Sequence, residues 1–409
     1  MDILIRNISS LAVTEPGLSP VCGADLANLK ILSNAFLLIR KGLIESFGPD
    51  AHAPVGLAET YDAQGGMVIP GFVDCHTHLV FAASREKEFV MKIHGATYSE
   101  IAKAGGGILN SAAALSVTSE DELFERSLKR LQELISKGTT AIEIKSGYGL
   151  TVEAEAKMLR VARRLGKASD IPVKTTFLGA HTVPAGIHKR DYLQVILNEM
   201  IPAVASEGLA DFIDVFCENG FFDPAESEMI LEAGKKAGMI PRIHANQLGN
   251  SGGVQVAVRC GAVSADHLEH LGEEEIRLLQ NSTVMPVALP GAAFFLRLPF
   301  TPARNLINAG LPLAIASDYN PGSSPSGNMM MMWSLACIGM RMTPEEALHA
   351  MTINPSIVLG IQHSHGSIAV GKVGSVIITK PATSLAYLPY HYAMDAVENV
   401  VVAGRLLNY

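Results

Sequence analysis

The chain has 409 residues, of which 48% are hydrophobic and 18% charged, and its formal net charge is −8. This composition supplies a large buried core and excludes a disordered chain. The acidic balance argues against nucleic-acid binding, which usually needs a basic surface. The most apolar stretch, residues 329–340, is shorter than the roughly 20 residues that span a bilayer, so we expect no membrane-spanning segment.

The cysteines and the first residues favour a cytoplasmic location. The five cysteines are odd in number, lie far apart and form no C-x-x-C pair, which is typical of a reducing compartment. Residues 1–10 contain two charged side chains and no long apolar run, so they do not resemble a secretory signal. We therefore expect a cytoplasmic protein.

Both ends of the chain predict β-structure. Short runs with the apolar or alternating pattern of strands occur near the start and near the end. These runs are residues 3–6, 35–39, 43–47, 376–378 and 397–403. We predict one small β-sandwich domain that is built from residues 1–66 and 366–409.

The middle of the chain, residues 67–365, predicts an α/β fold. Eight apolar runs of strand length alternate there with helical patterns, and cap signals at Ser119 and Thr343 mark two helix starts. The eight runs are residues 68–75, 139–145, 173–180, 212–217, 239–243, 262–266, 283–288 and 311–317. Strands that alternate with helices form βαβ units, and eight units are typical of a (β/α)8 TIM-like barrel. We predict this barrel for residues 67–365.

Histidines and one aspartate follow four of these predicted strands. His76 and His78 follow the first run, and strand alternation places both on the same face. His244, His267 and Asp318 follow the fifth, sixth and eighth runs. The carboxyl ends of barrel strands converge on the face where active sites form. Taken singly, each residue could be a core histidine or a capping aspartate, but together they predict a metal site.

The donor types suit one divalent ion. Imidazole and carboxylate ligands fit Zn²⁺ and Fe²⁺ alike. Two-metal sites in such barrels commonly use a modified lysine at the end of the fourth strand, and residues 212–218 contain no lysine. Lys145 ends the second run instead, where an interior ion pair is the simpler interpretation. We therefore expect a single Zn²⁺ or Fe²⁺.

Several longer motifs make a specific resemblance. They are residues 70–78 (Pro-Gly-Phe-Val-Asp-Cys-His-Thr-His), 104–108 (Ala-Gly-Gly-Gly-Ile), 145–150 (Lys-Ser-Gly-Tyr-Gly-Leu), 264–268 (Ser-Ala-Asp-His-Leu) and 317–322 (Ser-Asp-Tyr-Asn-Pro-Gly). With these motifs the chain resembles the amidohydrolase superfamily. Within it, the chain is similar to the enzymes that open the ring of 4-imidazolone-5-propanoate in histidine degradation. The resemblance implies metal-dependent hydrolysis of that cyclic amide to N-formimidoyl-L-glutamate.

The resemblance also implies a role for each matching residue. The implied metal ligands are His76, His78, His244 and Asp318. The implied substrate contacts are Arg85, Tyr148, His181, Gln247, Asn320, Gly322 and Ser323. The implied catalytic groups are His267 and Asp318, for the proton of water and the carbonyl, and His181, as a donor to the developing oxyanion. An arginine offers a planar fork for the substrate carboxylate, whereas an amide such as that of Gln247 cannot act as a base.

Two other functions stay open at this point. A one-metal deaminase of the same superfamily would act on a purine-like or pyrimidine-like ring and would not need Arg85 for an anionic tail. A non-catalytic scaffold would be expected to have lost metal ligands, and this chain keeps all four. In each enzymatic case the expected partner is a small molecule, and the sequence leaves a homodimer open.

Overall fold

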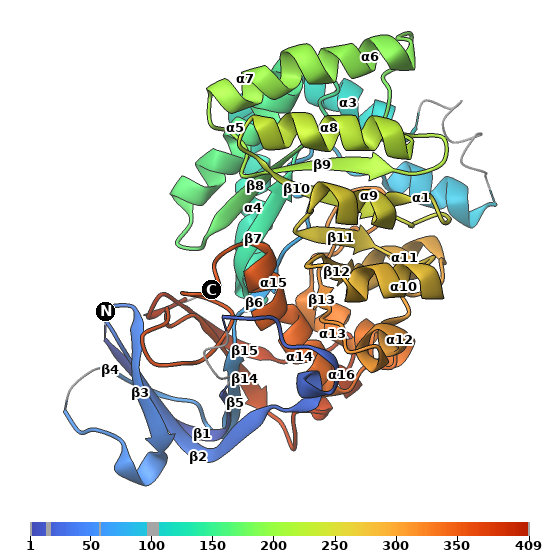
Figure 1. Ribbon diagram of the computed structural model, residues 1–409. Coiled ribbons are helices and arrows are strands. Elements are labelled where there is room, and N and C mark those ends of the chain that lie inside the picture. The colour runs from blue at the N-terminus through green and yellow to red at the C-terminus, as the bar shows by residue number, and fades with distance from the viewer. Residues whose placement is uncertain (1, 14–17, 57–58, 96–105, 408–409) are drawn as a thin grey trace.

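The computed structural model describes residues 2–13, 18–56, 59–95 and 106–407. Two eight-stranded sheets organise this part of the chain. In Figure 1 the sheet from the two chain ends, blue and red, lies below the barrel, which runs from cyan through green and yellow to orange. The predicted fold class, a TIM-like barrel beside a small β domain from both chain ends, is confirmed.

The barrel sheet is parallel throughout. Its strands are β6 (Phe72–Asp74), β7 (Thr139–Lys145), β8 (Val173–Ala180), β9 (Phe212–Cys217), β10 (Ile240–Ala245), β11 (Ser264–His267), β12 (Met285–Ala288) and β13 (Ala314–Ile315), in this spatial order. Between the first and last strands the ring is closed by one parallel bridge, Thr77 with Tyr319. The amide of Asp318 donates to the carbonyl of His76 at 3.0 Å, and that of His78 donates to Tyr319 at 2.9 Å.

Helices surround the barrel and bury their apolar faces against it. They are α4 (Glu120–Ser136), α5 (Val152–Ala168), α6 (Lys189–Val195), the π-helical turn η3 (Ile196–Met200), α7 (Ile201–Ser206), α8 (Pro224–Lys236), α9 (Gly253–Cys260), α10 (Glu273–Gln280), α12 (Ala303–Asn308), α13 (Met329–Gly339), α14 (Pro344–Met351) and α15 (Ile353–Val358). Leu131 and Leu134 of α4 pack in one core cluster with Ile142 of β7. Both predicted caps are present, since Ser119 accepts from the amide of Glu122 and Thr343 forms a capping box.

The second sheet joins the two chain ends. Its strands are β1 (Ile3–Val13), β2 (Lys30–Arg40), β3 (Leu43–Pro49), β4 (Glu59–Asp62), β5 (Gly66–Pro70), β14 (Val376–Pro381), β15 (Val397–Val402) and β16 (Arg405–Leu406). At its centre β5 pairs with β1 in parallel and with β14 antiparallel. Short 3₁₀ turns, η1 (Gly23–Ala27) and η2 (Asp50–His52), and helix α16 (Tyr387–Tyr390) complete this part of the chain.

The first predicted barrel strand is divided between the two sheets. Residues 68–75 form the end of β5 in the terminal sheet and then β6 in the barrel. Gly71 makes the transition, and a side chain there would collide, since a Cβ would lie 2.2 Å from Oγ1 of Thr140. The amide of Gly71 donates to Ser375, while that of Phe72 donates to Gly138. The chain therefore changes sheets within one apolar run.

Three further helices flank the carboxyl face of the barrel. They are α1 (Glu86–Ile93), α3 (Ile108–Val117) and α11 (Pro290–Leu296). Residues 104 and 105 of the predicted glycine-rich motif lie outside the described residues. Within the described ranges, no helix is both long and apolar enough to cross a membrane.

Candidate active site

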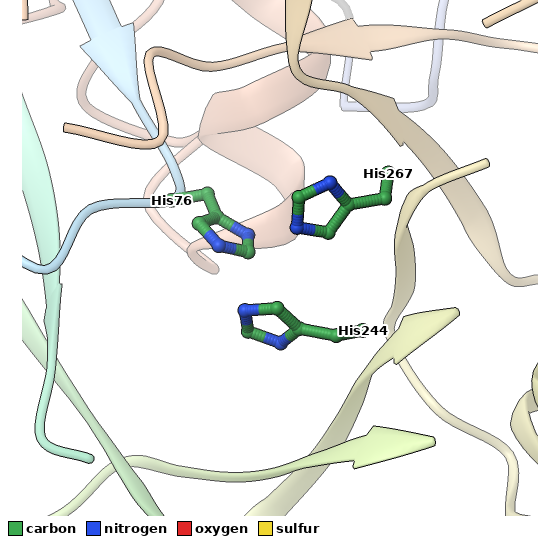
Figure 2. A group of neighbouring side chains, drawn as sticks. All are labelled: His76, His244 and His267. Carbon is green, nitrogen blue, oxygen red and sulfur yellow. The ribbon is translucent and has the colours of Figure 1, made fainter. Parts of the chain in front are cut away.

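Three histidines converge at the carboxyl ends of the strands. His76 follows β6, His244 lies in β10 and His267 ends β11. Figure 2 shows their rings pointing toward one another from three sides. The ring centres of His76 and His244 are 4.5 Å apart, and those of His244 and His267 are 5.3 Å apart. All three side chains are buried.

A second group joins the same place through His76. The Nε2 atoms of His76 and His78 each lie 3.5 Å from Oδ1 of Asp318. Within this group, and within the group of His76, His244 and His267, the candidate ligand atoms lie no more than 4.8 Å apart. The four residues that the sequence predicted as ligands are thus brought together with His267.

Buried carboxylates lie behind two of these rings. Oδ2 of Asp266 lies 2.6 Å from Nδ1 of His76, and Oδ2 of Asp214 lies 3.0 Å from Nδ1 of His244. A carboxylate that accepts a hydrogen bond from Nδ1 keeps the proton there and leaves the lone pair on Nε2, which holds for His76 and Asp266. Nδ1 of His244 lies close to Asp214 without a hydrogen bond. The Nε2 atoms of His76 and His244 are buried and have no hydrogen-bond partner among the described residues. A divalent ion would satisfy them, so the residues fit the metal that the donor set predicts.

Burial also keeps the rings in the ligand form. Desolvation is the main cause that holds the pKa of His76 and of His78 well below the usual value. The positive charge of Lys145 lowers the pKa of both rings further. Neutral imidazole is the form that binds a metal, so these histidines need not lose a proton first.

The carboxylates behind the histidines are themselves paired. Nζ of Lys145 lies 3.1 Å from Glu143 and 2.9 Å from Asp214. Arg242 donates to Asp266 at 2.7 Å. Lys145 is the interior ion-pair lysine that the sequence favoured, but the supporting roles of Asp214 and Asp266 were missed. The available signal was a charged residue inside an apolar strand, because a buried charge needs a partner.

His267 and Asp318 form the part of the site that can exchange protons. Burial lowers the pKa of His267, but the nearby carboxylates of Glu269, 3.2 Å from its Nδ1, and Asp318 raise it above the usual value. Burial raises the pKa of the Asp318 carboxyl to about 7, against the opposing charge of His267. A buried imidazole and a buried carboxyl whose pKa values are both raised are candidates for acid–base catalysis.

A cavity of about 470 Å³ opens above the histidines. It brings together all the sequence-predicted substrate contacts: Arg85, Tyr148, His181, Gln247, Asn320, Gly322 and Ser323. His78, His244, His267 and Asp318 also line it, whereas the side chain of His76 lies beneath. Lining residues that the sequence analysis missed include Phe89, Lys92, Phe216 and Phe295. They carry no motif and are recognisable only once α1, α11 and the strand ends face one another.

The side chain of Asn320 is used by its own loop. Its Nδ2 donates to the carbonyl of Asp318 at 2.6 Å and to Ser323 at 2.7 Å, and its Oδ1 accepts from the amides of Gly322 and Ser323 at 2.8 Å each. Asp318 has a φ of 52°, a left-handed conformation that such local hydrogen bonds stabilise. Asn320 therefore orients Asp318, a role beyond the substrate contact that the sequence analysis expected.

His181 presents an acceptor to the cavity. Its Nδ1 lies 3.0 Å from the carbonyl of Gly147, and burial lowers its pKa to about 3. The ring is thus neutral, Nδ1–H donates to that carbonyl, and Nε2 keeps its lone pair. This geometry opposes the oxyanion donor that the sequence analysis expected. Burial raises the pKa of the neighbouring Tyr148, so its phenol stays protonated and can serve as a donor.

The fold and the site together define a class of metal-dependent hydrolases. A parallel (β/α)8 barrel carries buried histidines and an aspartate at the carboxyl ends of its strands. The model of the amidohydrolase family matches residues 67–407. The chain belongs to this family and, within it, to the imidazolonepropionases, because relatives of that name match it over its whole length at 42–48% identity.

Two relatives illustrate the match. The imidazolonepropionase of Flavobacterium johnsoniae is 48% identical over 411 residues, covering 100% of both chains. That of Thermoanaerobacter pseudethanolicus is 42% identical, covering 98% of this chain and 96% of its own.

More distant solved structures share the fold alone. An adenosine deaminase from Xanthomonas campestris with bound zinc has a TM-score of 0.72 at 19% identity, covering 99% of this chain and 92% of its own. The guanine deaminase of E. coli has a TM-score of 0.75 at 14% identity, covering 100% of this chain and 99% of its own.

Proposed function

We propose that this protein hydrolyses the cyclic amide of 4-imidazolone-5-propanoate to N-formimidoyl-L-glutamate in histidine degradation. One structural observation carries the proposal: a single cavity has the histidine and aspartate cluster on its floor and the guanidinium of Arg85 on its wall. A ring that reacts at the floor could thus place an anionic tail on Arg85. The full-length similarity to imidazolonepropionases supports this substrate.

His76, His78, His244 and Asp318 would hold one divalent ion, Zn²⁺ or Fe²⁺. When bound, such an ion lowers the pKa of water from about 16 toward 7, which makes water a nucleophile near neutral pH. The neutral imidazoles, with unpaired Nε2 atoms on His76 and His244, support this ligand set. The number of ions and their identity are part of the proposal.

The chain's own residues bind the substrate and move the protons. Arg85 binds the propanoate, and the neutral Nε2 of His181 accepts a hydrogen bond from a ring N–H. Tyr148 and Gln247 complete the contacts with the ring. Oxygen from water adds to the ring carbonyl carbon and the C–N bond breaks.

Two residues manage the protons of this reaction. Asp318, whose carboxylate lines the cavity beside the proposed metal ligands, accepts the proton of water. His267 polarises the carbonyl and helps to deliver that proton to the leaving nitrogen. The proposal therefore needs both groups in the same cavity, and both His267 and Asp318 line it.

The direct test follows the ultraviolet absorbance of the imidazolone with purified metal-loaded protein. A His244→Ala variant is measured in parallel, because the free substrate decays on its own. We expect fast loss with the wild type alone and N-formimidoyl-L-glutamate as the product. Equal rates with both proteins would refute the proposal, and ammonia release from a neutral purine or pyrimidine would support the deaminase instead.

The cellular setting is also proposed. A cytoplasmic location agrees with the five cysteines, all of which are free thiols. The expected small-molecule partner follows from the reaction. A homodimer stays a prediction, and light scattering on the purified protein measures it.

A further inference from the structure

A buried carboxylate holds the proposed carboxylate-binding arginine. Arg85 immediately precedes α1, and Glu88 lies one turn along that helix. Oε2 of Glu88 accepts a hydrogen bond from Nε of Arg85 at 2.9 Å and a second one from Nη2. Oε1 accepts from the amide of Gly107, the residue before α3, at 2.9 Å. Only 10% of the Arg85 side chain and 6% of the Glu88 side chain are exposed.

These contacts decide which edge of the guanidinium is free. Glu88 occupies Nε and one hydrogen of Nη2, so the terminal Nη1–Nη2 edge remains. No described residue accepts a hydrogen bond from Nη1. This edge has two parallel N–H groups, the geometry that binds a carboxylate through both oxygens. Gly322 packs against Nη1 and Cζ from the side nearer Nε, so a Cβ there would collide with the guanidinium.

Apart from these hydrogen bonds, the negative charge of Glu88 is unfavourable for binding an anion at Arg85. A carboxylate beside an anion-binding arginine repels the anion and weakens the field of the cation. Lys92 adds a second positive charge in the same cavity, with Nζ 3.3 Å from the carbonyl of Gly322. Arg297 adds a further cation to the lining, and these positive charges together favour an anionic substrate tail. Glu88 thus opposes binding by its charge and can favour it only through geometry.

We propose that Glu88 is a positioning residue that turns the free edge of Arg85 toward the cavity and anchors it to the start of α3. The inference rests on the proposed function, because it takes the propanoate of the substrate as the ligand of Arg85. In this proposal, selectivity for an anionic tail comes from the orientation of Arg85 and not from the number of positive charges.

The first test asks whether one substitution raises or lowers KM in the metal-loaded enzyme. With Glu88→Gln we expect kcat/KM for 4-imidazolone-5-propanoate to fall at least about tenfold, mainly through KM, since the arginine loses its charged partner. If Glu88 acted through charge alone, its removal would lower KM, and that result would overturn the proposal. Glu88→Asp, which keeps the charge and shortens the reach, should also raise KM. Glu86→Gln on the exposed face of α1 is the matched control.

The second test separates positioning from a general effect on folding. In an Arg85→Ala background we expect Glu88→Gln to change kcat/KM less than twofold, because Glu88 then has nothing to orient. For the methyl ester of the substrate, which has an uncharged tail, Glu88→Gln should also change kcat/KM less than twofold. Additive losses, or equal losses with the ester, would show a merely structural role and overturn the proposal. An inactive wild type would count against the proposed function instead.

Discussion

The floor and the wall of the cavity are built from different parts of the fold. The floor consists of His78, His244, His267 and Asp318 at the ends of barrel strands, with His76 directly beneath it. Hydrogen bonds between strands fix these positions, and buried ion pairs support the rings from below. Such a floor cannot change without disturbing the barrel, so it is suited to the chemistry that a whole family shares.

The wall that faces the proposed substrate tail comes from helices and loops. Arg85 and Glu88 belong to the start of α1, Gly107 to the start of α3, and Gly322 to the loop after β13. Lys92 is only partly buried, unlike the floor residues. Loops and helix ends vary more freely than strand ends, so specificity can change here while the reaction stays the same. The comparison predicts that floor variants lose activity on every substrate and wall variants only on anionic ones.

The largest effect should come from the floor. His244→Ala removes a proposed ligand and should lower kcat about 10³-fold or more, because several kcal/mol of activation are lost. The loss should be equal for the substrate and its methyl ester. Metal content by mass spectrometry should fall in parallel, while the exposed His52→Ala keeps both. A variant with full metal and full activity would break the distinction between floor and wall.

The next largest effect should come from changing a carboxylate that supports the floor. Asp266→Asn leaves the buried Arg242 with only the more distant carboxylate of Glu143, 3.8 Å away, which should cost about 3–5 kcal/mol of unfolding free energy. The same change frees Nδ1 of His76, so metal affinity should fall about 10–100-fold. Denaturant titration and metal competition measure the two effects. Asp395→Asn, at an exposed ion pair, should show neither.

The wall should show a smaller and more selective loss. Arg85→Lys keeps the charge but loses the two-pronged contact, so kcat/KM for the anionic substrate should fall about 10–100-fold. The methyl ester should change little. The exposed Arg277→Lys serves as control. Equal losses on both substrates would show that Arg85 affects the reaction itself and not only the binding of the anionic tail.

The smallest effect concerns His181. Its pKa of about 3 lies far below neutrality, so the ring is neutral above about pH 4 and does not titrate where the enzyme works. His181→Gln should lower kcat/KM about three- to tenfold through one hydrogen bond. Neither limb of the pH profile should move. A shift of the acidic limb would show that His181 takes part in proton transfer after all.

The parts of the fold that depend on local pattern could be predicted from the sequence. The bounds of β7, β8 and β9 agree with the predicted runs, because fully covered parallel strands are continuous apolar stretches. The division at Gly71 was missed, since the partner of β5 is β14 at the other end of the chain. Nothing within the run reveals that pairing.

The site divides in the same way. The ligands could be predicted because each lies at or shortly after the carboxyl end of an apolar run, and strand ends meet on one face. The acceptor role of His181 depends on a carbonyl 34 residues away along the chain. Glu88 and Asp266 are common charged residues whose roles depend on the side chain opposite them in space. Three-dimensional proximity, and not residue type, identifies them.

The single bridge that closes the barrel has a consequence for the nascent chain. Thr77 leaves the ribosome early, whereas Tyr319 and Asp318 follow only after most of the barrel has been made. The terminal sheet waits longer still, because β14 follows Tyr319 in the chain. Folding that depends on such distant contacts is slow. A chain whose synthesis has not reached Asp318 therefore carries the histidines of the site without the aspartate of the proposed ligand set, and the barrel can close only once that part of the chain has been made.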